Sequence, residues 1–104
     1  AGNAAVWEVD YKHRVISWHG DAVPLFGGAF TFEQFDNNTT DFIHDDDREP
    51  LARYFINLAQ GEGGSIEHRV IRANGEVTWA ESTGRRVLGR SGGVRKLIVL
   101  SKDI

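Results

Sequence analysis

The sequence EHRVIRANGEVTWAESTGRRV, residues 67–87, decides the fold of this chain. Apolar and polar side chains alternate along residues 65–72 and again along 76–88, which is typical of half-buried β-strands. The tripeptide Ala-Asn-Gly at 73–75 separates the two segments. Asn-Gly between alternating segments is a strong sign of a β-hairpin, because both residues tolerate the positive φ of a tight turn. The stretch therefore predicts two antiparallel strands paired along their length.

The length of the hairpin loop determines which side chains share a face of the sheet. A three-residue loop places Arg72 opposite Glu76. A two-residue loop shifts the register by one and brings Trp79 beside Val70. Because side chains alternate between the two faces, this shift would turn one strand over relative to the other. The residues of the hairpin alone leave both registers open.

Three further β segments, short helices and one longer helix are predicted around the hairpin. The other strands cover residues 6–10, 14–18 and 94–104. A spacing of i, i+3, i+4, i+7 places four apolar residues on one helix face, namely Leu51, Tyr54, Phe55 and Leu58. Residues 21–26 predict one helical turn that ends at a Gly-Gly pair, and 29–44 predict short helical turns, each held to the core by an aromatic side chain.

Length and composition indicate a single globular domain over residues 1–104. The chain is 40% hydrophobic and 26% charged, with a formal net charge of −3. It has no basic stripe and no apolar run of membrane-spanning length, so we expect neither nucleic acid nor a membrane as a partner. It also has no cysteine, which excludes disulfides and thiolate chemistry. Without methionine or a signal-peptide pattern, we expect a cytoplasmic fragment of a longer protein.

The run His44-Asp45-Asp46-Asp47 has two interpretations. Carboxylates and an imidazole can bind a divalent cation, and such a site would make the chain a small metal-dependent hydrolase. Alternatively the aspartates begin the longer helix, with Asp46 as N-cap, Glu49 completing a capping box and Pro50 within the first turn. The second interpretation requires no ligands from elsewhere, and the glycine expected at the sixth position of a calcium loop is missing. We therefore predict a helix start and no metal site.

Three motifs resemble, in the same order, those of PAS domains. FIHDDDRE at 42–49 is similar to the His-Pro-Asp-Asp-Arg stretch that opens their long helix, with Asp45 in place of the usual Pro. The hairpin 67–87 is similar to their paired strands, and VRKLIVLSKDI at 94–104 to their last strand. A second departure is His19, where many members carry Asn. The resemblance covers nearly the whole chain. It implies an α+β fold, with a five-stranded antiparallel sheet in the order 2-1-5-4-3 and with short helices and one longer helix on one face.

The resemblance favours the three-residue loop, which turns small side chains of the hairpin toward the helices. Small side chains leave space that either aromatic rings or a ligand must fill. His68 then points inward, either as a core histidine bonded to a neighbour or as a polar contact to a ligand. The residues expected to contact a ligand are Phe26, Phe35, Phe42, Tyr54, Phe55, His68, Ala80, Ser82 and Val99.

The cofactors of the family can be compared with the residues of this chain. Flavin photosensors of the family require a reactive cysteine, which this chain lacks. Haem-binding members usually carry a histidine on the long helix, whereas residues 46–60 contain none. A covalent flavin adduct and haem are therefore disfavoured. A non-covalent flavin or a small apolar metabolite stays possible, and the cofactor is unknown.

The same register predicts an apolar patch on the outer face of the sheet. Its members are Val6, Trp79, Ile98 and Leu100. An exposed apolar patch indicates a partner, here a second copy of the chain or a flanking helix. The resemblance implies a sensory or regulatory module, without catalysis of its own, in a larger signalling protein. The effector domain in the same chain would be a histidine kinase, a cyclic-dinucleotide enzyme, a phosphatase or a transcription regulator. The alternatives are a structural dimerisation spacer without a ligand and the metal-dependent hydrolase.

Overall fold

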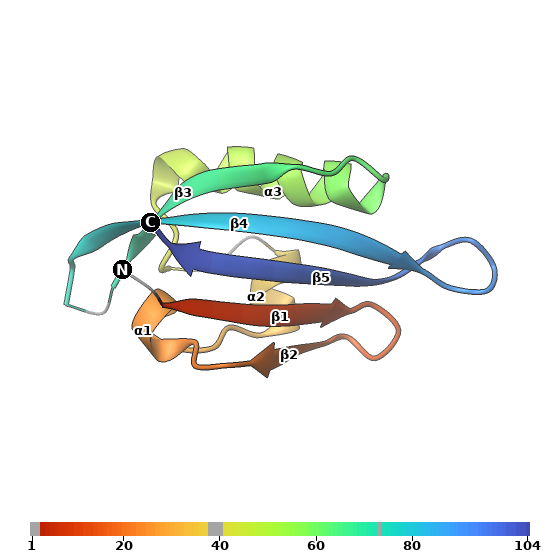
Figure 1. Cartoon of the computed structure of the whole chain (residues 1–104), viewed down its shortest axis with the longest axis horizontal. Helices are drawn as coiled ribbons and strands as arrows, with labels where there is room; N and C mark the ends of the chain where they lie inside the picture. The colour runs from red at the N-terminus through yellow and green to blue at the C-terminus, as the bar shows by residue number, and fades with distance from the viewer. Residues whose placement is uncertain (1–2, 38–40, 73) are drawn as a thin grey trace.

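A five-stranded antiparallel sheet forms the body of the protein. The computed structural model describes residues 3–37, 41–72 and 74–104. In space the strands follow the order β2-β1-β5-β4-β3, as Figure 1 shows. Their bounds are β1 (Ala4–Asp10), β2 (Val15–His19), β3 (Ser65–Ile71), β4 (Val77–Leu88) and β5 (Val94–Asp103). The α+β fold class and the strand order predicted from the sequence are confirmed.

The helices lie between β2 and β3 in the sequence and cover the inner face of the sheet. They are α1 (Val23–Phe26), α2 (Phe32–Asp36) and α3 (Asp45–Ala59). The longest, α3, packs against β3, β4 and β5, with Leu51 and Leu58 buried beneath it. α2 begins at a capping box in which Thr31 and Gln34 bond each other's backbone N–H groups. No helix in the described part of the chain has both the length and the apolar composition of a membrane span.

The register of the β3–β4 hairpin agrees with a three-residue loop. Ile71 lies opposite Val77, and Arg72 N donates a hydrogen bond to Glu76 O at 2.8 Å. Ala73, the first residue of the predicted loop, lies outside the described residues. In this register Ala80 and Ser82 face the helices and Trp79 faces outward, as predicted.

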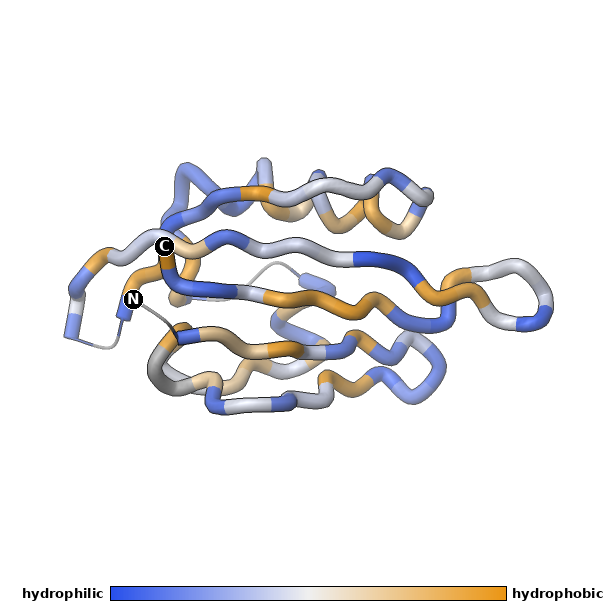
Figure 2. Tube along the Cα trace, in the orientation of Figure 1, coloured by the Kyte–Doolittle hydropathy of each residue, from blue (hydrophilic) through white to orange (hydrophobic). Residues whose placement is uncertain are grey.

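Buried apolar side chains collect between the inner sheet face and the helices. Leu97 and Val99 of β5 point to the inner face and are completely buried, whereas Leu100 points to the outer face and is exposed. Figure 2 shows the hydrophobic stretch of β5 in the middle of the sheet. The core cluster consists of Ala5, Trp7, Val9, Leu25, Phe26, Phe30, Phe32, Leu58, Val70, Ala80, Leu97 and Val99. Four of these residues are aromatic, so ring packing contributes strongly to the layer between sheet and helices.

The long helix begins two residues before the predicted position, so the predicted N-cap at Asp46 is wrong. His44 is the N-cap, and its Nδ1 accepts a hydrogen bond from Asp46 N at 3.2 Å. Glu49 forms an ion pair with Arg53 at 2.9 Å instead of completing a capping box. Because the helix starts earlier, Pro50 is in the second turn rather than the first. The three aspartates still occupy the first turn, where their charge favours the positive end of the helix dipole.

The segment that leads into α3 covers the outer edge of β3. Ile71 N donates to Phe42 O at 2.8 Å, and His44 N donates to Arg69 O at 3.4 Å. Asp47 accepts three hydrogen bonds from Arg69, from the backbone N at 2.7 Å, Nε at 3.0 Å and Nη2 at 2.9 Å. These bonds satisfy backbone groups that an edge strand would otherwise expose. They also fix the start of α3 against the sheet.

Candidate ligand cavity

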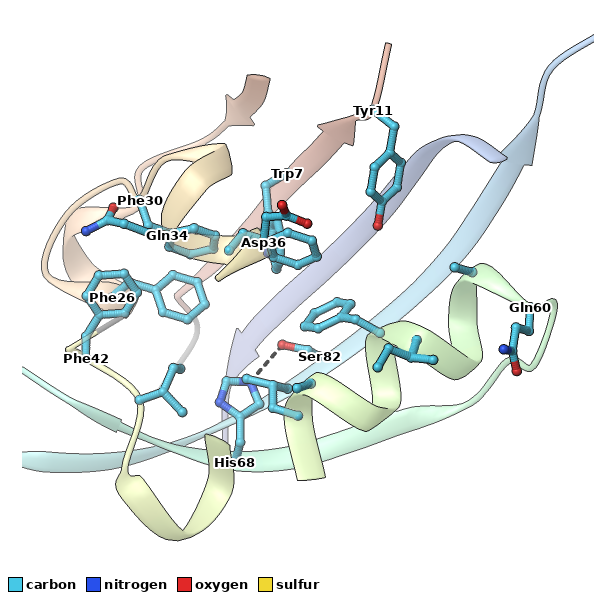
Figure 3. A pocket seen from close by; sticks show the side chains of 17 residues that line it. Trp7, Tyr11, Phe26, Phe30, Gln34, Asp36, Phe42, Gln60, His68 and Ser82 are labelled. Atoms are coloured by element: carbon cyan, nitrogen blue, oxygen red, sulfur yellow. Dashed lines mark hydrogen bonds between the residues drawn. The ribbon is translucent and has the colours of Figure 1, made fainter. Parts of the chain in front are cut away.

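A cavity of about 370 Å³ lies between the inner sheet face and the helices (Figure 3). This volume is near the lower end of the range for small-molecule sites, roughly 300–1,000 Å³. Most of its wall is apolar. The aromatic residues that line it are Trp7, Tyr11, Phe26, Phe30, Phe35, Phe42 and Phe55. The cavity is therefore large enough for a small, mainly apolar molecule.

Trp7 of β1 is the centre of the aromatic lining. Its ring centroid lies 5.0 Å from that of Phe30, 5.9 Å from that of Phe35 and 5.6 Å from that of Phe55, each in an edge-to-face arrangement. Such pairs stabilise a fold by about 0.5–1.5 kcal/mol each beyond their buried area. Aromatic rings thus occupy much of the space above the small residues of β4, and the cavity lies between these rings.

Six of the nine residues predicted to contact a ligand line the cavity. They are Phe26, Phe35, Phe42, Phe55, His68 and Ser82. Tyr54 is used elsewhere, because its hydroxyl donates to Gly64 O at 2.7 Å and accepts from Gly84 N at 2.9 Å, which joins α3 to the sheet. Ala80 and Val99 face the helices but are completely buried outside the cavity lining. Ala80 and Val99 therefore belong to the packed core rather than to the wall of the cavity.

Several residues that line the cavity were not predicted from the sequence. Trp7 and Tyr11 come from β1 and its end, where alternate residues face inward. The strand predicted over residues 6–10 could have indicated them, because every second residue of a strand, here 5, 7, 9 and 11, points to the same face. The others lie on α2, α3 and the connecting segments, namely Phe30, Gln34, Asp36, Ile43, Leu51, Ala52, Ile56, Ala59 and Gln60. Only their placement in space brings these residues to one cavity.

A chain of hydrogen bonds runs under the cavity from Trp7 to His68. Trp7 Nε1 donates to Ser101 Oγ at 3.0 Å, Ser101 Oγ and Ser82 Oγ are 2.7 Å apart, and Ser82 Oγ is 2.8 Å from His68 Nε2. His68, Ser82 and Ser101 are the buried polar residues of the described chain. The inward histidine predicted from the sequence is thus bonded to a neighbour, as the first of its two interpretations proposed.

Burial controls the charge of His68. Desolvation lowers the pKa of His68 to about 4, although the carboxylate of Asp47 partly opposes the shift. The imidazole is therefore neutral at neutral pH and carries one ring proton. If Ser101 donates to Ser82 and Ser82 donates to Nε2, both hydroxyls donate and accept, which assigns the proton to Nδ1. Nδ1 has no hydrogen-bond partner within the described part of the chain.

The mouth of the cavity carries Tyr11 and Asp36. Figure 3 shows the hydroxyl of Tyr11 directed toward the cavity from the end of β1, with the Asp36 carboxylate near Trp7. Burial, and then the negative charge of Asp36, raise the pKa of Tyr11 above its usual value of 10.0, so its hydroxyl stays protonated. Asp36 also lies 3.9 Å from the guanidinium of Arg14. Among the described residues that line the cavity, Asp36 alone carries a formal charge when His68 is neutral.

The four residues of the acidic run do not converge on one point. Asp47 bonds Arg69, and the Asp45 carboxylate lies 3.4 Å from Arg48 Nε. His44 Nδ1 already accepts from the backbone of Asp46. Across residues 3–37, 41–72 and 74–104, no three His, Cys, Asp or Glu side chains are grouped so that they could hold a metal ion. The run therefore starts a helix and attaches it to β3.

The predicted outer-face residues all face away from the helices, but they form two groups rather than one continuous patch. Val6 lies opposite Leu100 in the β1–β5 pair, and Ile98 follows on the same face of β5. Trp79 is at the far end of the sheet, where the Arg69 guanidinium lies over its ring at 5.2 Å. Between the groups, Lys102 Nζ and Glu81 Oε1 form an ion pair at 3.3 Å.

Together, the antiparallel sheet, the covering helices and the aromatic cavity between them define an α+β domain. The chain matches the family model described as PAS fold over residues 15–100. Because this match covers most of its length, the chain belongs to the PAS family, as the motifs indicated. A comparison with curated proteins gave no significant match.

Solved structures with the same fold include domains of signalling proteins. The N-terminal domain of a diguanylate cyclase with PAS/PAC sensor from Marinobacter aquaeolei has a TM-score of 0.80 and 20% identity, and the alignment covers 97% of this chain and 94% of that one. A sensory box histidine kinase/response regulator from Burkholderia thailandensis has a TM-score of 0.71 and 22% identity, with 97% and 76% covered. The PAS-B domain of Drosophila melanogaster Cycle with bound ethylene glycol has a TM-score of 0.69 and 12% identity, with 96% and 99% covered. At these identities the likeness shows the fold.

Proposed function

We propose that this chain is a sensory module of a larger signal-transduction protein, and that it responds to a small molecule bound in its cavity. Membership of the PAS family supports a regulatory rather than a catalytic role. Two of the similar structures come from a diguanylate cyclase with a PAS/PAC sensor and from a sensory box histidine kinase. By analogy, an effector domain of one of these kinds lies in the same protein.

The observation that carries the proposal is the cavity of about 370 Å³ with its aromatic wall. Protein interiors are close-packed, and a void of this size in a small domain forgoes dispersion contacts that a ligand would restore. The polar groups beside it are few, namely His68 and Ser82 at the floor and Tyr11 at the mouth. An apolar wall with a few converging polar groups is the usual composition of a small-molecule site.

Native mass spectrometry of the purified domain tests this proposal directly. We expect a bound small molecule, or a rise in melting temperature when candidate ligands are added, because a ligand that binds only the folded state stabilises it. The variant Ala52→Phe places a large ring from α3 in the cavity and should abolish both effects. The matched control is Arg53→Phe, which adds the same ring at the next, exposed position of the helix. Ligand effects that persist in Ala52→Phe would contradict the proposal.

We also propose that the outer face of the sheet mediates assembly, either with a second copy of the domain or with a flanking helix. Trp79 is 47% exposed and Leu100 is 43% exposed, so both large apolar side chains are accessible to a partner. Val6 and Ile98 lie next to Leu100 and enlarge that group. If the cavity holds no ligand, this face alone would support the simpler role of a dimerisation spacer.

A further inference from the structure

We infer that the cavity selects an uncharged ligand and rejects anions, and that Asp36 at its mouth determines this selectivity. The inference rests on the proposed function, because it names the class of molecule that the same cavity accepts. It excludes carboxylates, phosphates and nucleotides as ligands. Four observations carry it, namely the charges of the lining, the neutral state of His68, the aromatic wall and the contacts of two arginines beside the cavity.

The charged residues of the lining are unbalanced. No lysine or arginine side chain lines the cavity within the described residues, whereas Asp36 does. An anion that leaves water requires a counter-charge or several hydrogen-bond donors, since an unpaired charge in an apolar surrounding is strongly unfavourable. Here an entering anion would meet a carboxylate at the mouth and no cation beyond it.

His68 cannot supply the missing positive charge. Its side chain is almost completely buried, and its Nε2 is bonded to Ser82 at 2.8 Å. The low pKa of His68, about 4, keeps the ring uncharged at neutral pH. Protonation of Nε2 would also force Ser82 and Ser101 to reverse their hydrogen bonds. The floor of the cavity is therefore polar but neutral.

The aromatic wall adds to the discrimination. An aromatic ring has a negative face and a positive edge, so ring faces repel anions and attract cations. Phe35 and Phe55 both line the cavity, with their ring centroids 5.0 Å apart, and the Phe55 centroid lies 5.6 Å from that of Trp7. Neutral molecules pack well against such surfaces, because the dispersion contacts do not depend on charge.

Two arginines that approach lining residues, Arg14 and Arg86, are engaged by other groups. The Arg14 guanidinium lies over the ring of Phe32 at 4.6 Å, and Arg86 Nη1 donates to Ala59 O at 3.3 Å. Neither arginine lines the cavity. The Arg14 guanidinium also lies 3.9 Å from the Asp36 carboxylate, which is too far for a direct hydrogen bond.

Two fluorescent probes with the same ring system test the inference. N-phenyl-1-naphthylamine is uncharged, and 8-anilino-1-naphthalenesulfonate carries one sulfonate. We expect the uncharged probe to bind at neutral pH at least about tenfold more tightly, which corresponds to about 1.4 kcal/mol. Both titrations are repeated with Ala52→Phe, and only the binding that this variant removes is assigned to the cavity.

The variant Asp36→Lys separates charge selectivity from simple hydrophobicity. It replaces the carboxylate at the mouth by an ammonium group, and we expect the affinity ratio of the two probes to fall several-fold because the anion gains a counter-charge. Glu76→Lys makes the same change in net charge in the β3–β4 turn, at an exposed position outside the cavity lining, and should keep the wild-type ratio.

The outcomes distinguish the inference from the proposed function. Cavity-dependent binding of both probes with equal affinity overturns the inference and leaves the proposed function in place. An unchanged ratio in Asp36→Lys overturns the role of Asp36 and with it the inference. If Ala52→Phe removes the binding of neither probe, the cavity takes no ligand, and the proposed function and the inference fail together.

Discussion

The two faces of the same sheet follow different rules. On the inner face of β5, Leu97, Val99 and Ser101 are completely buried, and each is explained by contacts within the domain. On the outer face of the same strand, Leu100 is 43% exposed. Ile98 beside it has no helix above it, since the helices cover the other face. Alternation thus assigns residues to the two faces, whereas contacts within the domain explain the burial of only one of them.

Arg69 is the residue that belongs to both faces. Its backbone N and guanidinium bond Asp47 at the start of α3, and the same guanidinium lies over Trp79 on the outer face. Its neighbour His68 points the other way, into the floor of the cavity. Arg69 thus connects the start of α3 to Trp79 on the outer face.

The largest expected difference between the faces concerns core stability. Leu58→Ala on the inner side should lower the free energy of unfolding by about 2–5 kcal/mol, because Leu58 is 2% exposed and its removal leaves a cavity. Leu100→Ala removes the same atoms on the outer face and should cost well under half as much. Urea unfolding of both variants measures the difference. Equal losses would mean that the outer face is as tightly packed as the core.

A second test of the inner face is the pH dependence of stability. The pKa of His68 is about 4 in the folded chain and 6.5 in the unfolded chain. Between these pH values the unfolded chain therefore binds a proton at His68 that the folded chain does not bind. Stability should therefore fall as pH drops from 6.5 toward 4, by at most about 1.4 kcal/mol per pH unit from this group. Urea unfolding between pH 7 and pH 4 measures the slope.

The variant His68→Gln is the control for this slope. Gln cannot titrate, so the contribution of residue 68 between pH 6.5 and pH 4 should disappear even if the variant is less stable at pH 7. The contribution of Asp47 falls in a separate range, because Arg69 lowers its pKa and its stabilisation is lost only as pH falls below about 3.8. A slope that is unchanged in His68→Gln would show that other groups cause it.

The contrast between local and distant interactions also explains what the sequence could predict. The strands and the hairpin follow from alternation and from the Asn-Gly turn, which are local signals, but these signals left the register of the hairpin open. The N-cap could not be predicted from the preferences of residue types for that position, because aspartate is a preferred N-cap and histidine is not. In the fold the Asp47 carboxylate is bound by Arg69, 22 residues away, a contact that no local pattern indicates.

The residues that line the cavity could be predicted only in part, because some of them come together through contacts between distant segments. Inward-facing residues of the hairpin, such as His68 and Ser82, could be recognised from the register that the family resemblance favoured. Asp36 and Ile56 could not, because their contribution depends on how α2 and α3 approach each other above the sheet. The hydrogen-bond chain through Ser101 likewise joins residues as far as 94 positions apart. Such contacts have no periodic signal in the sequence.

The connection between α3 and the edge of the sheet has an intermediate expected effect. Asp47→Asn removes the charge that accepts three hydrogen bonds from Arg69 and should cost about 1.5–3 kcal/mol, the usual contribution of a hydrogen bond to a charged group. Asp46→Asn is the matched control, since Asp46 is 77% exposed and only reaches Arg69 at 4.0 Å; a change within about 0.5 kcal/mol is expected. Thermal unfolding at neutral pH compares them, and similar losses would refute the special role of Asp47.

The smallest effect on stability, and the most informative for the outer face, is expected for Trp79→Ala. Trp79 is 47% exposed, and its ring lies under the Arg69 guanidinium. The free energy of unfolding of the monomer should therefore fall by only about 0.5–1 kcal/mol. Self-association in sedimentation velocity should weaken more than this loss of stability explains, because Trp79 would be an interface residue. The Glu81–Lys102 ion pair separates Trp79 from the Val6–Leu100 group, so Leu100→Ala tests the second half of the face independently. Weakening in only one variant would locate the interface at one end of the sheet, and self-association unchanged in both would refute assembly through this face.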